Sequence, residues 1–184
     1  TQYGYLDEAY KLLFRKEYPS WLYPVTKGAT TIWERWDGIK ADGSFQSAGM
    51  NSFNHYAYGA VGDWLYKAVA GINSAPGSPG YKKIVIKPHP GGKMNDVKAS
   101  HESPYGTIVS EWNIQDNSLT LSVEIPANTT AEVFMPSTGK ELEINGLAAG
   151  NPEKVQQEGL KYHYLKQTIG SGRYVFKSPF NPGD

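Results

Sequence analysis

The sequence predicts an α+β protein in which a few helices precede an antiparallel β-sandwich. Three observations support this prediction. Apolar residues recur at helical spacing before about residue 75, and later segments alternate apolar and polar residues over short stretches. A run of turn-forming residues, 73–80, separates the two patterns. We interpret this run as the connection between two domains, 1–75 and 80–184.

Two helices are expected in the first domain. The first covers residues 6–14, where apolar residues share one face, and Pro19 sets its latest possible end. The second is expected to begin with Asn51 or Ser52 as its N-cap and to run toward Gly71 as its C-cap. It is apolar or small on nearly every face, so it needs neighbours on most sides. Two helices cannot supply those neighbours. The first domain is therefore expected to be incomplete, with its other helices upstream.

The second domain is expected to consist of short antiparallel strands with one buried face per sheet. Asn145-Gly146 and Gly170-Ser171-Gly172 are interpreted as turns, the latter as a hairpin turn. The expected strands are 83–87, 107–114, 118–125, 130–135, 141–144, 161–169 and 173–177.

Composition excludes several classes of protein. The 184 residues carry 18 basic and 18 acidic side chains, and this zero net charge argues against nucleic-acid binding. No run of about 18 apolar residues is present, so no membrane span is expected. The absence of cysteine excludes disulfides and thiolate chemistry, and no metal or other cofactor is expected. The chain begins at Thr1 and shows no secretory leader pattern. We expect it to be a processed product or a piece of a longer protein. The sequence does not indicate its compartment.

The densest polar and aromatic stretch, residues 28–38, places Glu34 beside Trp33 and Trp36. Apolar rings disfavour the charge of a carboxylate, which makes it an acid or base near neutrality, and they also offer a surface on which sugars stack. This pattern favours a glycosidase. The alternative is that both tryptophans belong to the core, with Glu34 and Arg35 solvated or paired.

A second polar cluster, residues 49–56, contains Asn54 and His55 at the expected helix start. Free backbone N–H groups at such a position can bind hydroxyls or anions. The alternative is a simple helix cap with a half-buried histidine. The remaining histidines have no metal-ligand spacing and are assigned to structure or surface: His89, His101 and His163.

The two clusters closely resemble the C-terminal region of the bacterial α-L-rhamnosidases. The resemblance lies in GATTIWERW at residues 28–36, MNSFNHYAYG at 50–59 and AVGDWL at 60–65. It continues through GYKKI and KPHP at 80–84 and 87–90, SPYG at 103–106 and IPANT at 125–129. It implies the end of an (α/α)6 barrel followed by a β-sandwich. It also implies an inverting enzyme that releases terminal L-rhamnose from glycosides or polysaccharides.

By this resemblance, Glu34 is the general base that activates water and His55 lines the rhamnose subsite. Trp33, Trp36, Arg35 and Asn54 flank these positions as the pocket wall. The family's general acid lies in a motif far upstream that these residues do not contain. The chain is therefore expected to be a C-terminal fragment, inactive alone, that covers its apolar helix faces by packing on the sandwich or by self-association.

Two other readings of the sandwich stay open. It could be a carbohydrate-binding or structural module without catalysis, in which the helices are a folded remnant. Alternatively, this region could be a domain that holds the barrel and the sandwich together, with no direct contact between the sandwich and a ligand. The second is favoured for residues 80–184, because no aromatic platform stands out there.

Overall fold

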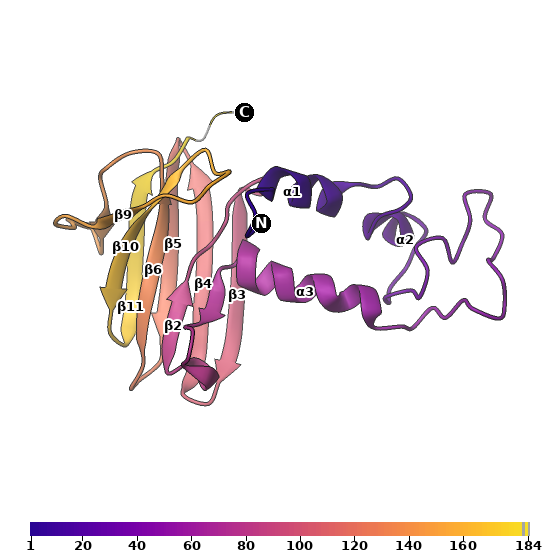
Figure 1. Ribbon diagram of the computed structural model, residues 1–184, viewed down its shortest axis with the longest axis horizontal. Coiled ribbons are helices and arrows are strands. Elements are labelled where there is room, and N and C mark those ends of the chain that lie inside the picture. Colours follow the sequence, from indigo (N-terminus) through magenta and orange to yellow (C-terminus); the bar gives the residue numbers. More distant parts are fainter. Residues whose placement is uncertain (182, 184) are drawn as a thin grey trace. The chain divides into compact units, whose positions relative to one another are not determined.

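The computed structural model describes residues 1–181 and 183, and it divides into two compact units. One unit consists of residues 7–64. The other consists of residues 1–6 together with the described residues from 65 onward. The α+β fold class predicted from the sequence is confirmed, since a few helices precede two β-sheets (Figure 1). None of the helices in the described residues is long and apolar enough to cross a membrane.

The unit 7–64 contains short helices joined by irregular chain (Figure 1). Helix α1 (Leu6–Phe14) ends before Pro19, as predicted, and buries Tyr10, whose ring meets Trp64 edge to face at 5.3 Å. Burial raises the pKa of the Tyr10 phenol. The other helical segments of this unit are α2 (Leu22–Thr26), a 3₁₀ turn η1 (Ala57–Ala60) and α3 (Val61–Trp64).

The predicted start of the second helix at Asn51 or Ser52 is wrong, because the first helical turn begins at Ala57. The preceding residues bond instead to an earlier segment. Ser52 and His55 both give their backbone N–H groups to residues 32–34, so these donors are not available to begin a helix. Local cap preference was outweighed by contacts between residues about twenty positions apart.

The predicted end of this helix at Gly71 is confirmed. A π-helical turn η2 (Leu65–Val69) follows α3, and Gly71 has a left-handed φ of 81°. The last carbonyls of the helix are satisfied by groups from the sandwich. Trp112 donates its indole N–H to the Val69 carbonyl at 2.8 Å, and the Ser110 hydroxyl donates to the Ala70 carbonyl at 2.7 Å. The sandwich therefore anchors the C-terminal end of the helix.

The strands form two sheets (Figure 1). The first has the order β1-β2-β6-β10-β9 and the second has the order β3-β4-β5-β11-β7-β8. Pairing is antiparallel as predicted, except that β2 and β6 run parallel. The strand bounds are β1 Ile72–Ser74, β2 Lys83–Ile86, β3 Asp96–Ser103, β4 Gly106–Gln115, β5 Ser118–Ile125, β6 Thr130–Ser137, β7 Glu143–Ile144, β8 Leu147–Ala148, β9 Glu153–Val155, β10 His163–Ile169 and β11 Gly172–Pro179.

Alternation along the strands places one face of each sheet in the core. Strand β5 alternates half-buried and buried residues along its whole length. The fully buried side chains come from both sheets: Ile84, Ile86, Val133 and Met135 from the first, and Ile108, Leu119, Leu121 and Phe176 from the second. Polar bonds also cross between the sheets, since the Ser178 hydroxyl donates to the Pro136 carbonyl at 2.7 Å.

One turn interpretation is corrected by the topology. Gly170-Ser171-Gly172 is not a hairpin turn, because it joins β10 of one sheet to β11 of the other. The run 73–80 overlaps the loop between β1 and β2, which pair with each other, and the division into domains 1–75 and 80–184 stays a prediction. Asn145-Gly146 does form the predicted turn, with left-handed φ values of 53° and 78° between β7 and β8.

We expect the buried ring of His89 to make the stability depend on pH. The ring is buried, its Nδ1 lies 3.3 Å from the Ala68 carbonyl oxygen, and it meets the Tyr164 ring edge to face. Burial, with a further contribution from the charge of Lys87, lowers the pKa of His89 to about 4. The folded state therefore keeps the ring neutral at a pH where the unfolded chain already binds a proton.

We expect His89 to cost about 3 kcal/mol of stability as the pH falls from about 6.5 to about 4. Replacing His89 by glutamine should remove that part of the pH dependence. The measurement is urea unfolding at several pH values in this interval. The matched control is His101→Gln, at a half-buried ring that lies at a tilt against the Tyr81 ring, and it should keep the wild-type slope. An unchanged slope in His89→Gln would contradict the expectation.

Candidate active site

The two polar clusters predicted from the sequence lie side by side in the unit 7–64. Glu34 donates its backbone N–H to the Ser52 carbonyl at 2.8 Å, and His55 donates its N–H to the Ile32 carbonyl at 2.8 Å. These bonds tie the two segments together like a short piece of sheet. The residues expected to act as base and as sugar contact therefore stand on adjoining segments.

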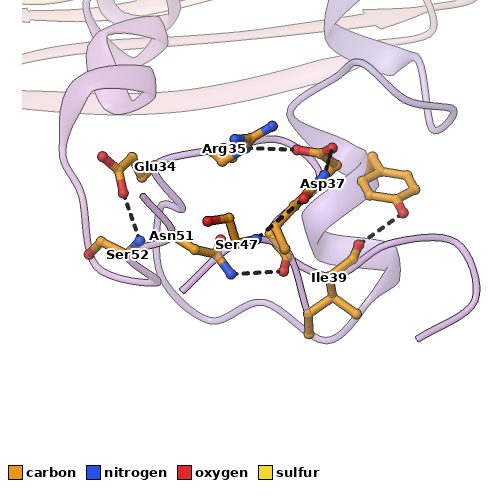
Figure 2. Close-up of polar contacts among 10 residues, drawn as sticks. Glu34, Arg35, Asp37, Ile39, Ser47, Asn51 and Ser52 are labelled. Atoms are coloured by element: carbon orange, nitrogen blue, oxygen red, sulfur yellow. Dashed lines mark hydrogen bonds and ion pairs between the residues drawn. The ribbon is translucent and has the colours of Figure 1, made fainter. Parts of the chain in front are cut away.

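Glu34 has one carboxylate oxygen held by the backbone. The Ser52 N–H donates to Oε2 at 2.7 Å (Figure 2). The residue is half-buried, and in the described part of the chain its carboxylate forms no ion pair. A hydrogen bond from a backbone donor to a carboxylate is charge-assisted and restricts the rotation of the side chain. The arrangement can therefore present an oriented carboxylate whose other oxygen, Oε1, accepts a proton.

His55 is half-buried beside an exposed aromatic ring. Its Nδ1 accepts a hydrogen bond from the Ala57 N–H at 3.4 Å. In the neutral ring the proton then resides on Nε2, which can donate to a hydroxyl. The Tyr56 ring lies parallel to the imidazole, with the ring centres 5.5 Å apart, and is 88% exposed.

Arg35 belongs to a polar network on the same segment (Figure 2). Its Nε donates to Oδ1 of Asp37 at 3.2 Å, and Gln46 donates its side-chain amide to Oδ2 of Asp37 at 2.6 Å. Burial acts to raise the pKa of Asp37, but the bonds from Gln46 and Arg35 and the charge of Arg35 together lower it. Asp37 therefore stays ionised and holds Arg35, whose side chain is 42% exposed.

The two tryptophans differ in position. Trp33 is only 5% exposed and packs edge to face on Phe53, so it has little surface for a sugar. Trp36 is half-buried and stacks on Tyr58 with ring centres 3.8 Å apart. Both line a small apolar cavity of about 40 Å³, which is far below the several hundred Å³ of a typical ligand pocket. Neither ring stands free as a sugar platform in this unit.

Asn54 is exposed, and its backbone N–H donates to the Ser52 hydroxyl at 3.2 Å. Sequence reasoning missed the parts played by Asp37, Gln46, Asn51 and Ser52, which it passed over or took as helix caps. For Asn51 and Ser52, the signal in the sequence was their place in the same polar cluster as His55, residues 49–56. Within residues 1–181 and 183, no group of three or more His, Asp or Glu side chains could hold a metal ion.

Comparison with known proteins identifies two family domains. Residues 1–69 match the bacterial alpha-L-rhamnosidase 6 hairpin glycosidase domain, and residues 71–147 match the bacterial alpha-L-rhamnosidase C-terminal domain. An alpha-L-rhamnosidase of Streptomyces avermitilis is 49% identical over 137 residues, which are 74% of this chain and 13% of that protein. One of Formosa agariphila is 41% identical over 182 residues, which are 97% of this chain and 19% of that protein.

A solved structure gives the same likeness in three dimensions. The crystal structure of Streptomyces avermitilis alpha-L-rhamnosidase complexed with L-rhamnose superposes with a TM-score of 0.82 at 41% identity. It covers 93% of this chain and 16% of that one. The chain thus spans less than a fifth of the length of these relatives.

Proposed function

The chain belongs to the bacterial α-L-rhamnosidase family, and we propose that it is the C-terminal part of an enzyme that hydrolyses terminal α-L-rhamnose from glycosides with inversion. In this proposal, residues 1–75 complete a six-hairpin catalytic domain and residues 80–184 form its closing β-sandwich. Glu34 is the general base. The observation that carries the proposal is the half-buried Glu34 carboxylate, fixed by the Ser52 N–H at 2.7 Å beside the segment of His55.

The reaction needs two carboxyl groups on opposite faces of the glycosidic bond. An acid supplied by a part of the enzyme outside these residues protonates the leaving oxygen as the bond from the anomeric carbon breaks. Glu34 takes a proton from the water that attacks the same carbon from the other side. In inverting enzymes the two groups stand about 6.5–9.5 Å apart, which leaves room for that water. An isolated chain that lacks the acid is therefore expected to be inactive.

The remaining site residues are proposed to bind substrate or to support those that do. His55 donates from Nε2 to a rhamnose hydroxyl, and Arg35 and Asn54 offer further donors at the wall. Trp36 forms part of the pocket wall with its half-buried ring. The burial of Trp33 against Phe53 supports a role in holding Glu34 in place more than one in contacting sugar.

The sandwich is proposed to have a structural part in the enzyme. Support comes from its bonds to the end of the preceding helix, at the carbonyls of Ala68, Val69 and Ala70. An isolated chain is also proposed to self-associate through apolar helix faces that a complete barrel would cover.

The experiment that tests the proposal is chemical rescue in the full-length enzyme. Glu34→Ala should lose most activity on a rhamnoside that carries a good leaving group. Added azide should restore turnover, because it attacks the anomeric carbon without giving up a proton. The expected product is a rhamnosyl azide of inverted configuration, identified by NMR. Absence of rescue, or a product of retained configuration, would contradict the role of Glu34.

A further inference from the structure

The side chain of Asn51 is held by Gly38, and the next residue in the chain, Ser52, holds the carboxylate of Glu34. The contact between Asn51 and Gly38 is called the clamp below. The side-chain amide of Asn51 donates to the Gly38 carbonyl at 3.1 Å (Figure 2). Its Oδ1 is buried and, among the residues that the structure describes, has no hydrogen-bond partner. A buried polar atom without a hydrogen-bond partner lowers the stability of the folded state by about 1–3 kcal/mol. The fold therefore keeps this side chain in place although it is destabilising.

Gly38 leaves room for the clamp because glycine has no side chain. A Cβ at position 38 would lie 2.9 Å from Oδ1 of Asn51 and 3.1 Å from each of the Phe53 and Trp33 rings. Only glycine lets the three side chains close around this point. The Gly38 carbonyl also accepts the backbone N–H of Gln46 at 3.1 Å, so the acceptor for Asn51 is itself fixed.

The clamp bears directly on the carboxylate of Glu34. Ser52 follows Asn51 in the chain, and its N–H is the donor to Oε2 of Glu34. The direction of that N–H is set by the peptide plane that joins Asn51 to Ser52. On the other side of Ser52, Phe53 packs edge to face on Trp33, the residue before Glu34, with ring centres 5.0 Å apart. Residues on both sides of the amide are thus fixed.

We propose that Asn51 is a positioning residue for the general base. By anchoring to Gly38 it holds the Ser52 N–H on Oε2 of Glu34, and this leaves Oε1 as the oxygen that takes the proton from water. This inference rests on the proposed role of Glu34. Asn51 itself touches neither substrate nor water in this scheme; it acts through the backbone of Ser52.

The test uses the full-length enzyme with two variants. Asn51→Asp keeps the shape but replaces the donor by an oxygen that repels the Gly38 carbonyl. Asn51→Ala removes the clamp. Both should lower kcat roughly ten- to hundredfold with KM little changed, because the base loses its orientation while the sugar contacts remain.

The matched control is Asn73→Ala. Asn73 also donates its side-chain amide to a backbone carbonyl, that of Lys67 at 2.8 Å, but it belongs to the other unit. Its removal should leave kcat unchanged. Thermal melts of all variants separate loss of folding from loss of orientation, and Asn51→Asp, which is nearly isosteric, stays informative if Asn51→Ala does not fold.

A double-mutant cycle separates this inference from the proposed function. If Asn51 acts through Glu34, the Asn51→Asp effect should disappear in a Glu34→Gln background. Additive effects, or Asn51→Asp with parental kcat, would overturn the positioning role while Glu34 keeps its own. Parental activity in Glu34→Gln alone would instead overturn the proposed function.

Discussion

Replacing Glu34 by glutamine in the full-length enzyme is expected to lower kcat by about 10²–10⁴-fold, the usual contribution of a proton-transfer group. This corresponds to about 3–5 kcal/mol of transition-state stabilisation. Glutamine keeps the shape of the side chain and an oxygen that can accept from the Ser52 N–H, but it cannot take the proton of the attacking water. KM should change little, since Glu34 binds water and not the sugar ring in the proposed mechanism.

The measurement is steady-state hydrolysis of an aryl rhamnoside by the purified full-length variant. Asp42→Asn is a suitable control in the same unit, because Asp42 is an exposed carboxylate that accepts hydrogen bonds from the Ser44 N–H and hydroxyl in a turn. The control should retain parental kcat. A Glu34→Gln enzyme that also does so would remove Glu34 from the role of base.

The second large effect is expected at Gly71, the helix end that the sequence predicted. A Cβ at this position would lie 2.2 Å from the Pro88 nitrogen and 2.4 Å from the Lys87 carbonyl carbon, both of which are backbone atoms that cannot rotate away. The φ of 81° adds the cost of a left-handed conformation. Backbone strain costs about 1–2 kcal/mol and overpacking about 1–3 kcal/mol. We therefore expect Gly71→Ala to lower the free energy of unfolding by about 2–5 kcal/mol.

Gly77 provides the matched control for this change. It has a similar left-handed φ of 71°, but a Cβ there would meet nothing within 4 Å among the described residues. Gly77→Ala should therefore lose only the conformational part, about 1 kcal/mol or slightly more. The measurement is urea unfolding of both variants at one pH. Equal losses would show that the contact of Gly71 with residues 87–88 is not maintained in solution.

Local patterns predicted the elements whose residues show a clear hydrophobic periodicity or a strong helix-ending signal. The alternation of 118–125 gave the bounds of β5, and helix α1 ends before Pro19 as expected. Strand β3 was missed, because Asp96–Ser103 alternates without large apolar residues and so carries a weak signal. The pairing of β2 with β6 in parallel also could not be predicted, since nothing in either strand specifies its neighbour.

The candidate site likewise has some features that the sequence predicted and others that it did not. Motif resemblance singled out Glu34 and His55, and the structure places their segments side by side. The clamp of Asn51 on Gly38 and the network of Asp37 with Arg35 and Gln46 were not predicted. These contacts join residues up to thirteen positions apart through an irregular loop, so no periodic pattern records them.

By itself, the sequence determined the α+β class, most strand positions and the family, because these follow from hydrophobic periodicity, turn residues and ungapped motifs. Only the tertiary structure decided where the second helix begins and which backbone amide holds Glu34. The reason is that residues 51–55 can satisfy their N–H groups in more than one way. The choice between a helical turn and bonds to residues 32–34 depends on contacts that exist only once the chain has folded.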